Sequence, residues 1–303
     1  MDYNFDLAVC LLCGNKGLSF LNNLRDDDQH WAAKCDTCGH TQITSLPSIE
    51  EDELYYKNNE MSKNLALESK LNEEQLMYKY EVMSTYQAET ITKHIPKNST
   101  ILEIGSGYGW VVEKLRDKGY CIEGIEINPL RIELAMERAG VHLKNVNILQ
   151  IPPEMDERYD CVCMFNLFEH IPVPIDFLIR SSTYLKKGGQ MVIEVPNLNS
   201  YLKEYSKGFK DFIFFRGHAS YFTPQTLSNV IRKAGYDNVQ IYGKQTYSVE
   251  NAIHWVRNNK PFLSYCQIDM PTGMEFINDL FKKKLETDMT SDTLVAIATW
   301  KAS

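Results

Sequence analysis

Three glycines at alternate positions close an apolar run in the stretch Ile101–Gly109, whose residues read Ile-Leu-Glu-Ile-Gly-Ser-Gly-Tyr-Gly. A helical pattern begins directly afterwards, at Trp110. A buried strand that turns sharply into a helix brings glycine backbone against a ligand, because glycine has no Cβ and adopts positive φ. The first turn of the helix also presents free N–H groups to the same ligand. The stretch therefore predicts a loop that binds a nucleotide-like cofactor.

Two carboxylates indicate which cofactor this loop would bind. Glu126 ends the second predicted strand, about 20 residues beyond Gly105, where an acidic side chain accepts both hydroxyls of a ribose. Glu103 stands shortly before Gly105 and would repel the pyrophosphate of a dinucleotide. S-adenosylmethionine instead carries an ammonium and a sulfonium group. The two carboxylates therefore favour S-adenosylmethionine over a dinucleotide.

Two Cys-x-x-Cys-Gly knuckles near the N-terminus indicate a metal site. Their cysteines are Cys10, Cys13, Cys35 and Cys38. Two thiolates on each tight turn can converge on one cation, and four sulfur ligands complete a tetrahedral zinc site with no position left for water. We therefore expect a structural zinc ribbon, because so short a segment has too little core to fold unaided. His30 and His40 lie nearby and are expected to be surface residues.

Length and charge bound the possible functions. The chain has 303 residues and a net charge of −8, enough for one sizeable domain and a smaller module. Proteins that bind nucleic acid usually have a basic surface, and the only cationic run is Lys282–Lys284. The first residues lack a secretion signal, and no apolar run is long enough to cross a membrane. We therefore expect a cytoplasmic protein with reduced cysteines and no membrane insertion, and the charge disfavours a nucleic-acid partner.

Three segments are expected along the chain: a zinc-ribbon module over 1–46, a helical linker and cofactor lid over 47–97, and an α/β domain over 98–303. Strands and helices alternate in the third segment, which predicts a doubly wound, Rossmann-like, seven-stranded sheet with helices on both faces. The expected strands are 100–104, 120–125, 141–146, 161–165, 191–197, 238–242 and 293–300. Helices are expected at 110–116, 129–139, 175–184 and 224–234.

Three further segments are assigned from their patterns. Residues of about 60–95 are helical in pattern, with a buried stripe of Leu65, Leu76, Tyr80, Met83, Tyr86 and Ile91. A turn over Leu185–Gln190 is expected to open the fifth strand. The segment of about 244–292 is too long for a hairpin loop, and we interpret it as an insertion that shapes the substrate side.

Two histidines follow strands of the α/β domain, at the edge where the cofactor loop is expected. His170 lies in the stretch Asn166–Pro172 after the fourth strand, and His218 follows the fifth. Imidazole titrates near neutral pH, so either histidine is a candidate general base. For His170, a structural role in which the ring bonds the loop backbone is favoured slightly. Glu169 is expected to be an anchoring carboxylate, and Arg216 is a candidate partner for an acidic group of the substrate.

The Glu-x-Gly-x-Gly-x-Gly stretch resembles motif I of class I S-adenosylmethionine-dependent methyltransferases. The stretch Asn166–Pro172, the Leu-Lys-x-Gly-Gly turn and the Val-Pro-Asn strand end resemble later motifs of the small-molecule members, so that the resemblance covers about residues 75–303. It implies a cofactor site made of Glu103, Ile104, Gly105, Ser106, Gly107, Gly109, Glu126, Ile127, Asn147, Ile148, Phe165 and Asn166. It also implies that a helix before motif I folds over the cofactor, with Tyr78, Tyr80 or Tyr86 in contact.

Together with the zinc ribbon and the insertion, these motifs resemble bacterial methyltransferases that modify sugars, often as nucleotide-linked or surface-polysaccharide precursors. The Asn/Asp-Pro-Pro-Tyr/Phe motif used on amine and amide nitrogens is absent after the fourth strand. The resemblance therefore implies methyl transfer to a small molecule, with a sugar oxygen favoured. Two alternatives stay open: an RNA methyltransferase with a zinc-binding substrate module, and a non-catalytic cofactor-binding subunit. The oligomeric state is left open.

Overall fold

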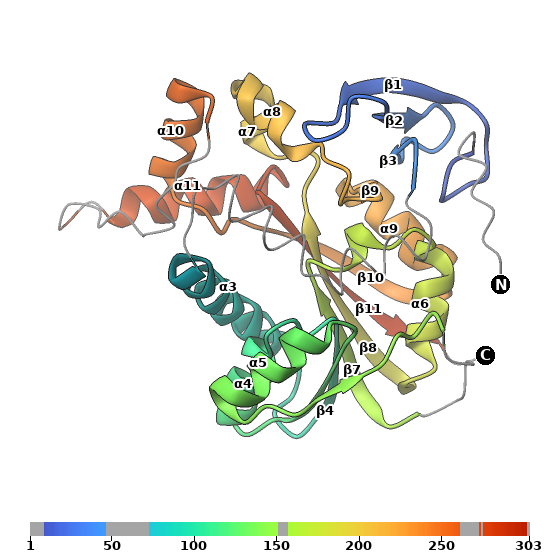
Figure 1. The fold of residues 1–303 in the computed structure, drawn as a ribbon, viewed down its shortest axis with the longest axis vertical. Coiled ribbons are helices and arrows are strands. Elements are labelled where there is room, and N and C mark those ends of the chain that lie inside the picture. The colour runs from blue at the N-terminus through green and yellow to red at the C-terminus, as the bar shows by residue number, and fades with distance from the viewer. Residues whose placement is uncertain (1–8, 47–72, 151–156, 261–272, 274, 302–303) are drawn as a thin grey trace.

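Two β-sheets organise the chain (Figure 1). The structure is a computed structural model and describes residues 9–46, 73–150, 157–260, 273 and 275–301. The larger sheet has seven strands in the order β10-β11-β8-β7-β4-β5-β6. These are β4 (Thr100–Ile104), β5 (Cys121–Glu126), β6 (Leu143–Asn145), β7 (Tyr159–Phe165), β8 (Leu185–Pro196), β10 (Tyr236–Lys244) and β11 (Thr293–Trp300). Only β11 runs antiparallel to both of its neighbours, β8 and β10. This architecture confirms the predicted doubly wound sheet.

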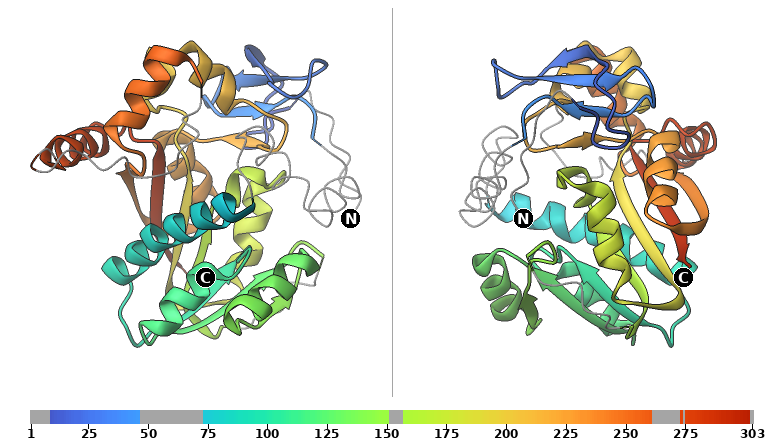
Figure 2. Two further views of the ribbon diagram at one scale, coloured as in Figure 1. Left: turned by 60° about the vertical axis from the view of Figure 1, so that its left-hand side comes forward. Right: turned by 90° about the vertical axis from the view of Figure 1, so that its right-hand side faces the viewer.

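Helices cover both faces of the large sheet (Figures 1 and 2). They are α3 (Glu73–His94), α4 (Trp110–Asp117), α5 (Pro129–Ala139), α6 (Pro174–Ser182) and α9 (Pro224–Lys233). Alternate strand residues divide between two cores, as the period of a strand requires. Val162 and Met164 pack in the core that contains α6 and α9, whereas Cys161 and Cys163 pack in the core that contains α3 and α4. The two cysteines are buried in apolar surroundings, as expected for inert core thiols.

The predicted turn over Leu185–Gln190 is wrong in part, because these residues belong to the long strand β8. The sheet accommodates them with an irregularity: Tyr159 pairs with Leu185, and Cys161 already pairs with Gln190. The extra residues loop out of the β7–β8 ladder there, at a glycine with positive φ, Gly188. The glycines therefore mark a bulge within a strand rather than its start.

The buried face of α3 is more polar than the predicted stripe. Ile91 is buried as expected, and Leu65 lies outside the described residues. The other fully buried side chains of the helix include Ser84, Gln87 and Thr90, whereas Tyr80 and Met83 are only half-buried. Gln87 donates to Glu194 of β8 at 2.9 Å, and Lys244 of β10 donates to Thr90 at 2.9 Å. A buried polar network therefore joins this helix to the sheet.

The smaller sheet has the order β1-β2-β3-β9, and Cys35 ends its second strand. Its strands are β1 (Leu18–Asn23), β2 (Trp31–Cys35), β3 (Thr41–Ile43) and β9 (Ser220–Tyr221). The fourth strand comes from the segment that follows β8, so the N-terminal sheet is completed by a distant part of the chain. A shared core of Leu24, Ile43, Phe214 and Tyr221 lies beneath this junction.

His40 is buried in this junction, so its prediction as a surface residue is wrong. Its Nε2 lies 3.2 Å from the hydroxyl of Ser220 in β9, and its ring packs on Phe222. Burial lowers the pKa of His40 to about 3, which keeps the ring neutral. His30 is half-buried and pairs with Asp27 at 2.7 Å.

Further helices are α7 (Tyr201–Tyr205), α8 (Lys207–Ile213), α10 (Val249–Asn258) and α11 (Glu275–Thr287). In Figure 1, α7 and α8 lie next to the smaller sheet, whereas α10 packs on α7 and α11 packs on β10. Helices α10 and α11 lie in the segment 244–292 that we interpreted as an insertion. Leu202 of α7 packs with Ala252 and Trp255 of α10, so the insertion rests on the helices that precede β9. In the part of the chain that the structure describes, no helix is both long and apolar enough to cross a membrane.

Candidate functional site

The site lies where the strand order of the large sheet reverses. β4 pairs with β5 on one side and with β7 on the other, and all three run parallel. In open α/β sheets a crevice forms at the carboxyl ends of the strands on either side of such a switch point. The glycine loop follows β4, Glu126 ends β5, and the stretch with His170 follows β7. The fold therefore brings the three predicted groups to one edge.

The glycine loop has the backbone conformation that the sequence predicts. Gly105, Gly107 and Gly109 all have positive φ, of 74°, 54° and 73°. A Cβ on Gly109 would approach Val141 to 2.9 Å, so this glycine allows the loop to pack on the segment before β6. A Cβ on Gly107 would meet no atom within 4 Å, so the loop is open there. The loop can thus present bare backbone to a ligand at Gly107.

The carboxylate of Glu126 is fixed by the backbone. It accepts N–H groups from Gly107 at 2.8 Å, from Ile127 at 2.9 Å and from Asn128 at 2.9 Å. An ionised carboxylate has about four acceptor positions, so these bonds orient the group without exhausting it. Because one bond reaches the glycine loop, Glu126 also joins the ends of β4 and β5.

The carboxylate of Glu103 is the feature that best fits a cationic ligand. It is buried beside the glycine loop, and its Oε2 atom has no hydrogen-bond partner among the residues that the structure describes. Burial, with a smaller contribution from the nearby charge of Glu126, raises the pKa of Glu103 to about 8. A buried carboxylate oxygen without a partner is costly, and an ammonium group would satisfy it. Glu103 therefore fits the ammonium of S-adenosylmethionine and not a phosphate.

Replacement of Glu103 by glutamine is expected to stabilise the protein and to weaken cofactor binding. The pKa of Glu103 is raised from 4.5 to about 8 in the folded state, so wild type loses stability as the pH rises through this interval. Glu103→Gln has no carboxyl group to ionise, so its free energy of unfolding relative to wild type should rise by about 3 kcal/mol between pH 5 and pH 7.5. Denaturant unfolding at both pH values measures the gain, and titration with S-adenosylhomocysteine measures the loss. Glu89→Gln, at an exposed position, is the control and should leave the free energy of unfolding unchanged. If the stability gained by Glu103→Gln does not grow with pH, the carboxyl group of Glu103 is not the cause.

Other predicted cofactor residues lie around this edge. Asn147 follows β6, and its side-chain oxygen accepts the N–H of Leu149 at 3.0 Å. Phe165 and Ile148 are buried, and Asn166 adopts a positive φ of 49° at the end of β7. Their contacts with a cofactor stay predictions, as do those of Ile104, Ser106 and Ile127.

A tyrosine of α3 also reaches the glycine loop. The ring of Tyr80 lies 5.2 Å from the ring of Tyr108, which stands between two glycines of the loop. Tyr86 instead lies near the ammonium groups of Lys244 and Lys282, and Tyr78 is exposed. Of the three candidates, Tyr80 is therefore best placed to help cover the cofactor.

Glu169, His170 and His218 form one cluster. The first two lie in the short helix η1 (Phe168–His170) after β7, and His218 comes from the loop before β9. The Nε2 atoms of the two histidines lie 3.8 and 3.9 Å from Oε1 of Glu169, and the ring centroids are 4.8 Å apart. One polar atom of each side chain lies within 4.8 Å of the others, so a single small group can contact all three.

The two histidines have different surroundings. Nδ1 of His170 lies 2.6 Å from the carbonyl of Gly217, so this nitrogen carries the proton and the ring anchors the loop. The side chain of His218 is more exposed than that of His170, 13% against 6%. His218 is therefore the more accessible base, and His170 has the backbone-anchoring contact that was favoured for it.

Burial governs the protonation of the cluster. It lowers the pKa of His170 to about 4 and that of His218 well below its ordinary value, so both rings are neutral at pH 7. It raises the pKa of Glu169 to about 8, with a smaller contribution from Glu194. Each neutral imidazole keeps one nitrogen that can accept a proton.

The four N-terminal cysteines also converge. The sulfur atoms of Cys10 and Cys38 are 3.5 Å apart, those of Cys13 and Cys35 are 3.6 Å apart, and all four lie within 4.8 Å of one another. Each knuckle ends in a glycine with positive φ, Gly14 and Gly39. Four sulfurs about 2.3 Å from a tetrahedral zinc would be about 3.8 Å apart, so the cluster has nearly the size of such a site.

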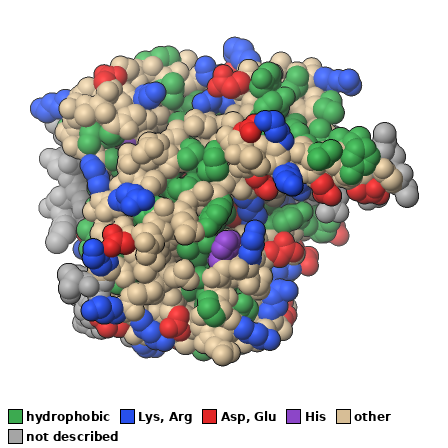
Figure 3. All heavy atoms as spheres, turned by 180° about the vertical axis from the view of Figure 1, so that it is seen from behind, with side chains coloured by type: hydrophobic (Ala, Val, Ile, Leu, Met, Phe, Trp, Pro, Cys, Tyr) green, Lys and Arg blue, Asp and Glu red, His purple; other side chains and the backbone are tan. Residues whose placement is uncertain are grey.

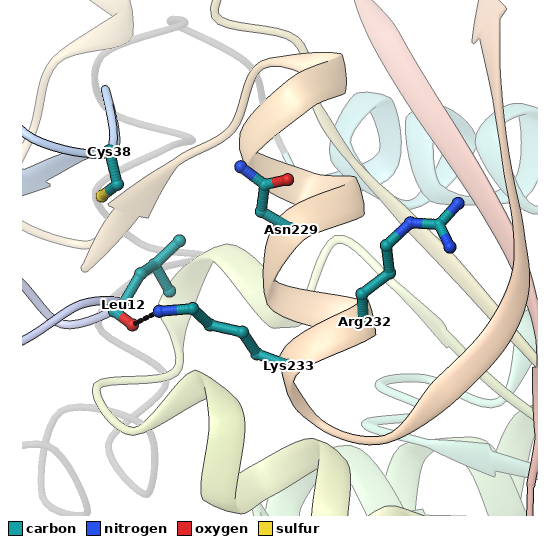
Figure 4. Close-up of a pocket in the computed structure, with 5 residues that line it drawn as sticks. All are labelled: Leu12, Cys38, Asn229, Arg232 and Lys233. Atoms are coloured by element: carbon teal, nitrogen blue, oxygen red, sulfur yellow. Dashed lines mark hydrogen bonds between the residues drawn. The ribbon is translucent and has the colours of Figure 1, made fainter.

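A pocket of about 230 Å³ lies between the cysteine cluster and α9 (Figure 4). Its lining residues are Leu12, Cys38, Asn229, Arg232 and Lys233. The side-chain ammonium of Lys233 donates to the backbone carbonyl of Leu12 at 2.7 Å, so a side chain of α9 binds the backbone of the first knuckle. No residue of the glycine loop lines this pocket.

The order of the large sheet, the glycine-rich loop after β4 and the acidic residue that ends β5 define a class I S-adenosylmethionine-dependent methyltransferase. Residues 75–241, more than half of the chain, match the family model described as a methyltransferase domain. The chain belongs to this family.

Relatives and solved structures agree with this class. A ubiquinone biosynthesis O-methyltransferase of Coxiella burnetii is 22% identical over 165 residues, 51% of this chain and 70% of that protein. A tRNA U34 carboxymethyltransferase of Shewanella loihica is 32% identical over 121 residues, 37% of this chain and 36% of that protein. A possible histamine N-methyltransferase of Thermotoga maritima shares the fold with a TM-score of 0.52 and 19% identity, covering 82% of this chain and 99% of that one.

Proposed function

We propose that this protein transfers a methyl group from S-adenosylmethionine to an oxygen atom of a small acceptor, for which a sugar derivative is the favoured class. The observation that carries the proposal is the cluster of Glu169, His170 and His218 at the edge that also holds the glycine loop. A hydroxyl acceptor needs a group that takes its proton, and two neutral imidazoles stand at this edge. The name of the Coxiella relative, an O-methyltransferase, agrees with oxygen as the acceptor.

The chain's own residues divide the work of this reaction. S-adenosylmethionine, when bound, supplies an already activated methyl group, so the protein has to align the two reactants and exclude water. In our proposal, Glu103 binds the ammonium group and Glu126 accepts the ribose hydroxyls. His218 removes the acceptor proton through its Nε2, and His170 holds the loop of His218 in place.

The sugar class is supported by the resemblance of the motifs and by the charge of the protein. On the face shown in Figure 3, Lys and Arg side chains are interspersed with Asp and Glu, so no continuous basic patch favours RNA there. The tRNA-modifying relative keeps RNA as the second candidate. Acceptor screening therefore begins with sugar nucleotides, and binding of tRNA whose affinity falls steeply with salt would favour the second candidate.

Titration calorimetry with S-adenosylhomocysteine tests the proposal. Wild type should bind it, and Glu126→Gln should weaken the affinity at least tenfold, about 1.4 kcal/mol, because the neutral amide replaces carboxylate acceptors of the ribose and of Gly107. Glu123→Gln is the matched control, since Glu123 lies on the same strand but pairs with Lys144. If wild type does not bind S-adenosylhomocysteine, the proposed methyl transfer is contradicted.

We also propose that Cys10, Cys13, Cys35 and Cys38 hold one structural zinc ion. The size of the cluster supports this role, and its four sulfurs leave no open coordination position for catalysis. A reducing cytoplasm suits thiolate ligands, and it is the compartment that we propose.

A further inference from the structure

The N-terminal sheet holds the loop of His218 at several points. Near the start of the loop, the backbone N–H of Arg25 donates to the carbonyl of Phe214 at 2.9 Å. In its middle, the N–H of Arg216 donates to Oδ1 of Asp26 at 2.9 Å. At its end, β9 pairs with β3. The loop that presents His218 therefore packs against the cysteine module, by which we mean residues 9–46, with the four cysteines and strands β1 to β3.

The side chain of Arg25 contacts two aromatic residues across this junction. Its guanidinium carbon lies 4.1 Å from the ring centroid of Phe212 and 4.4 Å from that of Phe215. Its Nη1 also donates to the carbonyl of Phe212. A planar guanidinium stacks on aromatic rings in a way that a lysine ammonium does not. Arg25 therefore holds the rings of Phe212 and Phe215 through both shape and charge.

Phe215 in turn contacts the histidine. The ring centroids of Phe215 and His218 are 4.2 Å apart, and the N–H of His218 donates to the carbonyl of Phe215 at 3.2 Å. The hydroxyl of Tyr221 fixes Phe215 further, because it accepts the N–H of Phe215 at 3.0 Å and donates to its carbonyl at 2.9 Å. His170 contacts the His218 ring as well. A continuous set of contacts thus runs from Arg25 to His218.

We propose that Arg25, in the connection between β1 and β2, is a positioning residue that, through Phe215, holds the His218 ring in the orientation needed for proton removal. The inference rests on the proposed methyl transfer, and it assigns the cysteine module a part in the reaction. Arg25 acts through Phe215 and not on the reacting atoms. The titratable and charged groups that face His218 include Glu169, His170, Tyr221 and Arg25, and the positive charge of Arg25 opposes protonation of the ring.

Histidine NMR of the full-length, metal-loaded protein tests the contact directly. The Cε1–H resonance of His218, assigned with His218→Gln, should move in Arg25→Ala and in Phe215→Leu, because the ring loses a fixed aromatic neighbour. The double variant should show little more than either single one, since the two residues act in series. Arg25→Lys should also move the resonance, because it retains the charge without the stacking. Lys34→Ala is the matched control, an exposed cation of the same sheet.

Turnover separates positioning from mere packing. With S-adenosylmethionine and the low-molecular-weight fraction of a cell extract as acceptor source, Arg25→Ala and Arg25→Lys should each lower methyl transfer at least tenfold. Their affinity for S-adenosylhomocysteine should stay within twofold of wild type, because Arg25 does not border the glycine loop. Unchanged circular dichroism and metal content would show that the fold is retained.

Three results would overturn the inference: an unmoved His218 resonance in Arg25→Ala, full turnover despite a moved resonance, or wild-type behaviour of Arg25→Lys in both measurements. Failure of the proposed function has a different signature. In that case wild type does not bind S-adenosylhomocysteine, while the NMR comparison still decides whether Arg25 orients His218.

Discussion

Methyl transfer by the His218→Ala protein is expected to be at least about 100-fold slower than by wild type, with unchanged affinity for S-adenosylhomocysteine. The size of this decrease follows from the loss of a general base, which accelerates enzyme reactions roughly 10²–10⁴-fold. Cofactor affinity should be retained, because Glu103, Glu126 and the glycine loop lie on other strand ends. Initial rates with the acceptor found by screening, together with calorimetry, measure the two quantities.

His142→Ala is the control, since this histidine is exposed before β6. His170→Ala should behave differently from both, because loss of the bond to Gly217 removes a buried contact and lowers stability as well as rate. A His218→Ala protein with full turnover would remove this residue from the mechanism.

The pH dependence of the rate provides a second check on the same residue. Burial lowers the pKa of His218 well below 6.5, and a base is lost only when the pH falls through its pKa. The rate should therefore hold on acidification from pH 8 to pH 6.5 and fall only at lower pH. A midpoint near 6.5 or above would indicate a solvated base elsewhere.

Removal of metal from the cysteine cluster is expected to unfold the N-terminal sheet and to lower the free energy of unfolding by more than about 3 kcal/mol. The sulfur atoms of the two knuckles lie within 4.8 Å of one another, and without the ion they lose the metal–sulfur bonds that would hold the knuckles together. Cys35→Ser should have the same effect, because this cysteine is buried and serine is a poor zinc ligand. Metal analysis should find one zinc per chain, and thermal unfolding with and without chelator measures the loss.

Cys121→Ser is the matched control, because Cys121 is exposed on β5, outside the cluster. It should retain both the zinc and the stability of wild type. A metal-free preparation that unfolds at the same temperature as the metal-loaded protein would show that the four cysteines need no ion.

Local features of the fold followed from the sequence because their causes are local. The helix predicted over 129–139 is α5, capped at its start by the side chain of Asn128 and at its end by Gly140 with positive φ. Thr223 caps α9 and Pro224 opens it, so this helix begins where the expected helix at 224–234 begins. The glycine loop was equally predictable, because positive φ and the strand-to-helix change are properties of neighbouring residues.

Only the tertiary structure decided which distant groups meet. The residues of β9 carry no signal that they complete a sheet begun at Leu18, and Arg216 bonds to Asp26 across 190 positions of the chain. The same holds for Arg25, which sequence reasoning missed, and for the burial of His40.

For the candidate site, too, some features could be predicted from the sequence and others depended on the tertiary structure. The residue types at Glu103, Glu126, His170 and His218 indicated the chemistry, because they follow strands whose carboxyl ends share one edge. Their protonation and their roles depend on burial and packing, which only the tertiary structure shows. Burial raises the pKa of Glu103 to about 8, and packing places Nδ1 of His170 against the carbonyl of Gly217. Hydrophobic periodicity specifies which face of an element is buried, but the partner that covers the face is set by the whole chain.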